Sequence, residues 1–139
     1  MLIRLANTSD APALQKLNDL FNGEGCNTIE AIGESLAKNE QEIVCVAAEG
    51  DELAGFCCGQ VMRSMCYPRK YGEITELYVV EAYRRRGIGG RLLRATEHAL
   101  NERGVGHLHV LTDSINMAAQ TLYGSCGYAI TSEILLDKN

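Results

Sequence analysis

The residues with the clearest chemical pattern are the arginines and glycines at positions 83–93, which read Tyr-Arg-Arg-Arg-Gly-Ile-Gly-Gly-Arg-Leu-Leu. The preceding run, 74–80, is rich in β-branched and aromatic residues and predicts a strand. From Ile88 onward, apolar residues recur at helical spacing. The first N–H groups of a helix are unpaired and lie at the positive end of its dipole, and glycines let an anion approach them closely. This junction therefore predicts a phosphate site, and the three arginines that add positive charge favour a pyrophosphate.

Two familiar phosphate loops do not fit the same residues. No Gly-Lys-Ser or Gly-Lys-Thr ending follows the glycines, which excludes a Walker-type nucleotide loop. The dinucleotide-binding fingerprint usually opens its domain, whereas this loop follows at least three expected strands. A plain strand–helix turn without a ligand remains the alternative.

The elements that must position this loop follow from periodicity and turn residues. Helical faces are expected over residues 14–21, 29–36, 87–103 and 116–126, and Asn27 is expected to cap the second of these helices. Strands are expected over residues 2–5, 43–48, 53–62, 73–80, 108–112 and 128–136. The order β-α-α-β-β-β-α-β-α-β predicts an α/β fold with a mixed sheet flanked by helices.

Composition and charge limit the class of protein. A chain of 139 residues with 46% hydrophobic content fits one domain with one core. We expect no signal peptide and no membrane span, because no apolar run approaches about 20 residues. The six cysteines lack metal-ligand spacing and fit free thiols in a reducing cytoplasm, so no metal is expected. A net charge of -5 disfavours nucleic-acid binding.

The charges are unevenly distributed along the chain. Between Asp19 and Glu52 there are nine acids and a single base, Lys38. Between Arg63 and Arg103 there are nine bases and five acids. The first region suits a cationic partner and the second an anionic one, although both also fit ordinary solvated surface.

Two motifs carry a resemblance to a known family. Arg84-x-x-Gly87-x-Gly89, at a strand-to-helix junction, resembles the cofactor signature of the GNAT superfamily of acetyl-CoA-dependent N-acetyltransferases. A second match is Asn116-x-x-Ala119-x-x-Leu122-Tyr123-x-x-x-Gly127-Tyr128. The resemblance covers essentially the whole chain as a single domain. It implies a GNAT-like sheet that is splayed between the strands 74–80 and 108–112, with acetyl-CoA in the gap.

The resemblance also implies which residues hold the cofactor. The strand should bind the pantetheine arm through its backbone, the turn should bind the pyrophosphate, and the last helix should contact the thiol end. The expected cofactor-binding residues are Leu77, Tyr78, Val79, Arg84, Arg85, Arg86, Gly87, Ile88, Gly89, Gly90, Asn116, Ala119 and Tyr123.

The same resemblance indicates three catalytic candidates. Tyr123 is expected to protonate the departing thiolate, and core packing is the alternative for this ring. Glu76 or Glu73 is expected to take the proton of the amine, with a slight preference for Glu76. Since they are three residues apart, simple alternation places them on opposite faces of the strand.

The expected function is therefore N-acetyl transfer to a primary amine by direct attack in a ternary complex. The acid-rich region favours a small cationic acceptor, polyamine-like or aminoglycoside-like. Acetylation of a protein or peptide amine, and a non-catalytic acyl-CoA-binding module, remain alternatives. The sequence is compatible with either a monomer or a homodimer.

Overall fold

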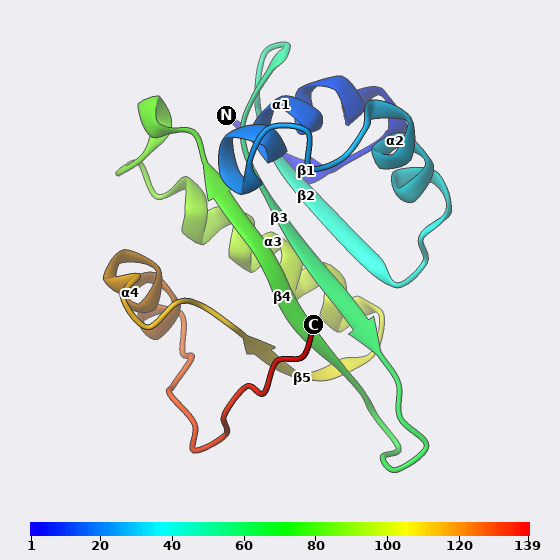
Figure 1. Ribbon diagram of the computed structural model, residues 1–139, viewed down its shortest axis with the longest axis vertical. Coiled ribbons are helices and arrows are strands. Elements are labelled where there is room, and N and C mark those ends of the chain that lie inside the picture. Colours follow the sequence, from blue (N-terminus) through cyan, green and yellow to red (C-terminus); the bar gives the residue numbers. More distant parts are fainter.

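A five-stranded mixed sheet runs through the computed structural model, which describes all 139 residues (Figure 1). The strands follow one another across the sheet in chain order: β1 (Leu2–Leu5), β2 (Glu42–Glu49), β3 (Glu52–Met62), β4 (Lys70–Val79) and β5 (Val105–Val110). The first four strands pair antiparallel, and β5 pairs parallel with β4. The predicted α/β fold with a mixed sheet is confirmed.

Four helices cover the sheet. The helices α1 (Ala11–Asn22) and α2 (Ile29–Lys38) lie on one face, and α3 (Ile88–Glu102) crosses the other. The short α4 (Met117–Ser125) lies beyond β5, apart from α1 and α2 (Figure 1). None of these helices is both long enough and apolar enough to cross a membrane.

The two faces of the sheet have separate cores. On the α3 face, Leu92, Leu93 and Leu100 have no exposed surface and belong to a cluster of 13 buried residues. The cluster on the α1 face has five buried residues, among them Leu14, Leu17 and Phe56. Alternation along β2 and β3 supplies both cores, as expected of central strands that are buried on both sides.

Two glycines of β3 allow close contacts with neighbouring elements. A Cβ atom on Gly55 would lie 2.5 Å from the carbonyl oxygen of Tyr78 on β4. A Cβ atom on Gly59 would lie 2.8 Å from Cδ1 of Leu100 on α3. Both distances are too short for any side chain, so these positions bring β4 and α3 close to β3.

Two sequence predictions about elements are wrong. Residues 128–136 form no strand, because this segment makes no backbone ladder with β5, and Ile130, Ile134 and Leu136 are 80% or more exposed. Strand-forming residue types are not sufficient without a pairing partner. The cap of α2 is Thr28, whose Oγ1 accepts from the N–H of Ala31 at 3.1 Å, and not Asn27.

Candidate active site

The sheet opens between β4 and β5. Parallel pairing begins at Lys70 with Val105 and ends at Ile74 with Val110, so the second half of β4 has no neighbour on that side. Figure 1 shows β5 ending beside the middle of β4, with α4 standing beyond the opening. The predicted splay between these two strands is confirmed.

The open edge of β4 presents backbone groups of alternate residues. The N–H of Val80 donates to the carbonyl of Ala54 on β3 at 2.7 Å, and the carbonyl of Tyr78 also points at β3. Since backbone groups alternate along a strand, the N–H groups of Leu77 and Val79 point into the opening. Of the three predicted strand residues, Leu77 and Val79 therefore offer free donors. Tyr78 instead directs its ring to the α1 face, where it stacks on Phe21 at 5.2 Å.

The glycine turn follows directly at the end of this edge. Arg85 and Gly87 have φ values of 66° and 75°, and at Gly87 this left-handed conformation opens α3 without any side-chain cap. The first helical hydrogen bond runs from the N–H of Arg91 to the carbonyl of Gly87. The N–H groups of Ile88, Gly89 and Gly90 are thus left unpaired at the start of a 15-residue helix. This is the geometry that binds an anion.

The three predicted arginines have different surroundings. Nε of Arg84 donates to the carbonyl of Val79 at 2.8 Å, and the guanidinium lies 5.7 Å from the centre of the Tyr78 ring. Arg84 therefore fixes the turn to the end of β4. Arg86 lies over the Tyr83 ring at 5.2 Å, while Arg85 is exposed without a partner. All three keep positive charge beside the free N–H groups.

The predicted glycine at position 89 has a packing role as well. A Cβ atom there would lie 3.3 Å from Cδ2 of Leu122 on α4 and 3.8 Å from Cγ2 of Val79. The absence of a side chain thus brings the first turn of α3 close to both α4 and the open edge of β4.

The helix α4 places the remaining predicted cofactor residues. Oδ1 of Asn116 caps this helix by accepting from the N–H of Ala119 at 3.1 Å, which leaves its Nδ2 group free to donate. Tyr123 is 8% exposed and meets the Tyr128 ring edge-on, with ring centres 5.8 Å apart. No group lies within hydrogen-bonding distance of its hydroxyl, although every fully buried polar side-chain atom in the chain has a partner. The hydroxyl of Tyr123 therefore reaches accessible space.

Burial, together with smaller contributions from the charges of Cys57 and Glu76, raises the pKa of Tyr123 to about 12. The ring is consequently protonated at neutral pH.

The expectation that Glu73 and Glu76 lie on opposite faces is wrong. On β3, Gln60 is opposite Glu73 and Cys58 is opposite Glu76, whereas Gly59 is opposite Ile74. One extra residue in β4, Thr75, forms a β-bulge that interrupts the alternation. Because residues directly opposite each other share a face, both acids lie on the α1 face.

The two acids have different partners on that face. Oε1 of Glu73 lies 2.9 Å from Nε2 of His109 on β5, so Glu73 joins the two strands just where they separate. Glu76 forms no ion pair and lines a cavity of about 180 Å³ beneath α1 and α2. Burial raises the pKa of Glu76, and a hydrogen bond with Asn22 partly opposes this. The structure thus pairs Glu73 with a histidine and leaves Glu76 without a charged partner.

Sequence reasoning missed two side chains around these acids. His109 has no distinguishing spacing in the sequence, and only the β4–β5 register shows that it meets Glu73. Glu42 was one of nine acids in its region, yet it lines the same cavity as Glu76. No local signal in the sequence distinguishes Glu42 from the exposed acids around it.

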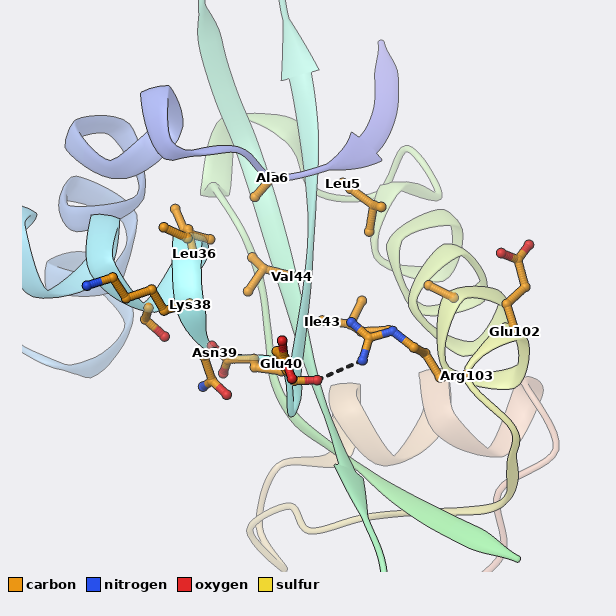
Figure 2. Close-up of a pocket in the computed structure, with 14 residues that line it drawn as sticks. Leu5, Ala6, Leu36, Lys38, Asn39, Glu40, Ile43, Val44, Glu102 and Arg103 are labelled. Atoms are coloured by element: carbon orange, nitrogen blue, oxygen red, sulfur yellow. Dashed lines mark hydrogen bonds between the residues drawn. The ribbon is translucent and has the colours of Figure 1, made fainter.

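A larger cavity than the one beside Glu76 lies elsewhere. It has a volume of about 450 Å³ and lies between the C-terminal ends of α2 and α3, where Nη1 of Arg103 donates to the carbonyl of Glu40 (Figure 2). The 15 residues of α3 separate Arg103 from the glycine turn by about 22 Å. None of the predicted site residues lines this cavity.

Comparison with known proteins gives the family. Residues 13–128 match the acetyltransferase (GNAT) family. The chain belongs to the GNAT acetyltransferase family. It is accordingly an acetyl-transferring enzyme, and the predicted family, fold and enzyme class are confirmed.

Individual relatives agree with this assignment. An uncharacterized N-acetyltransferase of Bacillus subtilis (strain 168), YhfO, is 29% identical over 92% of this chain and 89% of its own length. Streptothricin acetyltransferase of Streptomyces lavendulae is 32% identical over 86% of this chain, but the match spans only 61% of that enzyme. AAC(6')-Iy in complex with a bisubstrate analogue of CoA and acetylneamine has the same fold, with a TM-score of 0.85, 18% identity and coverage of 99% and 97% of the two chains.

Proposed function

We propose that this GNAT enzyme moves the acetyl group of acetyl-CoA to a primary amine of a small cationic acceptor, by direct attack while both are bound. The observation that carries the proposal is the position of Glu76. It is a half-buried acid without a counter-charge, in a cavity next to the open edge of β4. A cationic amine in this cavity would meet a carboxylate beside the place where a thioester fits.

The residues present fit coenzyme A. The unpaired N–H groups of residues 88–90 and the glycine at position 89 suit a pyrophosphate, and the free N–H groups of Leu77 and Val79 suit an extended amide chain that pairs like an added strand. When bound, acetyl-CoA supplies an acetyl group activated as a thioester. Nδ2 of Asn116 and the small Ala119 would border its sulfur end, and the N–H of Val79 would donate toward the acetyl carbonyl oxygen.

Proton transfer is assigned to Glu76 and Tyr123, the two titratable groups of the site that have no charged partner. An alkylamine with a pKa near ~10.4 is only about one part in a thousand neutral at pH 7, so the attacking nitrogen needs a base. Two protons leave the nitrogen: the ammonium releases the first to bulk water through Glu76, and Glu76 takes the second as the carbon–nitrogen bond forms. Tyr123 gives its hydroxyl proton to the sulfur as the carbon–sulfur bond breaks. A proton passed from Glu76 to Tyr123 through water then restores both groups. Glu73 holds the strands together through His109 and takes no proton.

Direct attack is favoured over an acetylated cysteine. The thiols of Cys57 and Cys58 lie on β3 opposite Leu77 and Glu76, and both are buried. Burial raises the pKa of Cys57 to about 12 and that of Cys58 well above its ordinary value. Neither thiol is therefore a thiolate at neutral pH, and the thiolate is the nucleophilic form.

The cationic class of the acceptor has support from two sources. The first is the acid-rich region 19–52, which contains the last turn of α1, all of α2 and all of β2. The second is the similarity to an enzyme named for streptothricin and to one bound to an acetylneamine analogue. Polyamine-like and aminoglycoside-like amines fit both.

Release of free thiol from acetyl-CoA, measured with a panel of amines, tests the proposal. The panel should contain linear polyamines, aminoglycosides, amino acids and lysine-containing peptides at equal concentrations. We expect turnover with the small polycations and little with amino acids or peptides. Turnover confined to peptides would contradict the acceptor class, and a stable acetyl group on one cysteine, in stoichiometric yield without acceptor, would contradict direct attack.

A further inference from the structure

The cavity that contains Glu76 holds a second carboxylate. Glu42 of β2 is opposite Gln60 of β3, and Glu76 of β4 is opposite Cys58 of the same strand. Two strand spacings of about 4.8 Å and two residues of about 3.4 Å each place the two glutamate Cα atoms about 12 Å apart. Both side chains line the same 180 Å³ cavity, Glu76 near the open edge of β4 and Glu42 farther from it.

The carboxylate of Glu42 has a fixed orientation and no positively charged partner. Nε2 of Gln60 donates to Oε2 of Glu42 at 3.1 Å, which holds the carboxylate toward the cavity. No lysine or arginine lines the cavity, and neither acid takes part in an ion pair. Burial raises the pKa of Glu42, hydrogen bonds from Gln60 and Ser35 oppose this, and the charge of Glu76 raises it again. Two half-buried carboxylates without a counter-charge are costly, and a bound dication would offset that cost.

The space around Glu42 continues away from the reaction site. Four residues, Ser35, Leu36, Glu42 and Val44, line both the smaller cavity and the larger one shown in Figure 2. The helix above them, α2, has no fully buried residue, so the sheet beneath it is loosely covered. A chain-like molecule can therefore lie under α2 with one end at Glu76. Beyond Glu42 the larger cavity is lined by charges of both signs, Glu40 and Glu102 together with Lys38 and Arg103.

We propose that Glu42 binds a second ammonium group of the acceptor, so that the enzyme selects linear diamines and polyamines over monoamines of the same length. This inference rests on the proposed function, because it takes the Glu76 cavity as the acceptor site. It adds a specificity-determining residue and a requirement for two amines.

The test compares butane-1,4-diamine with butylamine, which has the same carbon chain and one charge fewer. Calorimetry on the complex with coenzyme A measures binding of each amine without turnover, and thiol release measures kcat/KM. In the wild-type chain, the diamine should bind more tightly and have the higher kcat/KM. Glu42→Gln removes the charge and keeps the size, so it should lower the diamine-to-monoamine ratio of both quantities about 10- to 100-fold, as expected for a charge-assisted contact. Glu42→Asp should restore part of the ratio.

Glu40→Gln is the matched control. Glu40 is two residues away from Glu42 in the chain, and its side chain lines only the larger cavity, so the substitution removes one negative charge without touching the proposed site. It should leave the ratio within about twofold, whereas a general loss of surface charge would lower it equally. A wild-type chain that binds both amines alike, or a Glu42→Gln ratio equal to that of the wild type, would overturn the assignment. If the diamine binds through Glu42 but no amine is acetylated, the assignment stands and the proposed function fails.

Discussion

The two faces of the sheet differ in how tightly they are packed. On the α3 face a 13-residue cluster holds α3 and Tyr123, and the groups expected to bind coenzyme A are mainly backbone N–H groups. On the other face the cluster has five residues, α2 has no fully buried residue, and two cavities lie beneath it. The polar groups there are side chains, Glu42 and Glu76 among them.

This difference suggests that the α3 face serves cofactor binding and the α1 face serves acceptor binding. Backbone donors on a rigid core hold the same geometry whatever the surrounding side chains are, which suits a cofactor with fixed phosphates and amides. Side chains in a loosely packed space can be exchanged at low cost in stability, which suits acceptors that vary among relatives. The comparison predicts that changes on the α3 face affect the cofactor and stability, whereas changes on the α1 face affect the acceptor.

The largest effect is expected at Gly89. In Gly89→Val the side chain would meet Leu122 and occupy the space beside the free N–H groups, so acetyl-CoA binding should fall below detection by calorimetry. Thermal unfolding must show that the variant is folded. Near-normal affinity in a folded variant would remove the phosphate site from this turn.

Tyr123→Phe keeps the ring in the core and removes only the hydroxyl. Turnover should fall by roughly 10²–10⁴, or about 3–5 kcal/mol, while acetyl-CoA binding changes little. The measurement is kcat under conditions where chemistry limits the rate. A fall of less than threefold would return Tyr123 to a packing role.

Glu76→Gln and Glu73→Gln separate the two strand acids. Glu76→Gln should lower kcat/KM about 100-fold, whereas Glu73→Gln should lower it less than about fivefold, because Glu73 pairs with His109. Since the pKa of Glu76 is raised, the basic form is lost at a higher pH than for an ordinary glutamate. The acidic limb of the wild-type pH profile of kcat/KM should therefore lie above the usual carboxylate range. The opposite ranking of the two variants would identify Glu73 as the base.

The same substitution on the two faces tests the difference in packing directly. Leu100→Ala removes a side chain with no exposed surface and should lower the free energy of unfolding by about 2–5 kcal/mol. Leu36→Ala removes a half-buried side chain of α2 and should cost about 1 kcal/mol. Urea unfolding of both variants provides the values. Equal losses would show that α2 is held as firmly as α3.

The smallest effect is expected from the exposed acids of the α1 face. Glu24, Glu30 and Glu34 are all exposed and line neither cavity. Replacing all three with glutamine should raise the KM for a cationic acceptor about two- to fivefold at low salt, with the acetyl-CoA constant unchanged and the difference shrinking as salt is added. An unchanged KM at low salt would show that these acids do not attract the acceptor.

Much of the cofactor side could be predicted from the sequence. The strand, the glycine turn and α3 adjoin one another in the chain, so their chemistry is local and can be recognised from spacing alone. Asn116 and Tyr123 were identifiable because they share one short helix with a recognisable motif.

The acceptor side could not be predicted to the same degree, because it depends on register between distant strands. Glu42 and Glu76 are 34 positions apart, and only the pairing of β2, β3 and β4 brings them into one cavity. The pairing of Glu73 with His109 has the same origin. Residues 128–136 failed as a strand for a related reason, since their composition cannot show that no partner strand is present.

The single extra residue in β4 behaves like an insertion that changes a reading frame. Every residue after Thr75 has the opposite orientation to the one that an uninterrupted strand would give it. Without Thr75, the next acid would turn toward α3, and the N–H groups at the open edge would be those now bonded to β3. One residue thus sets the orientation of both the proposed base and the proposed pantetheine donors. An insertion or deletion in β4 before Glu76 would therefore reverse the side chain of the base and the direction of the N–H donors together.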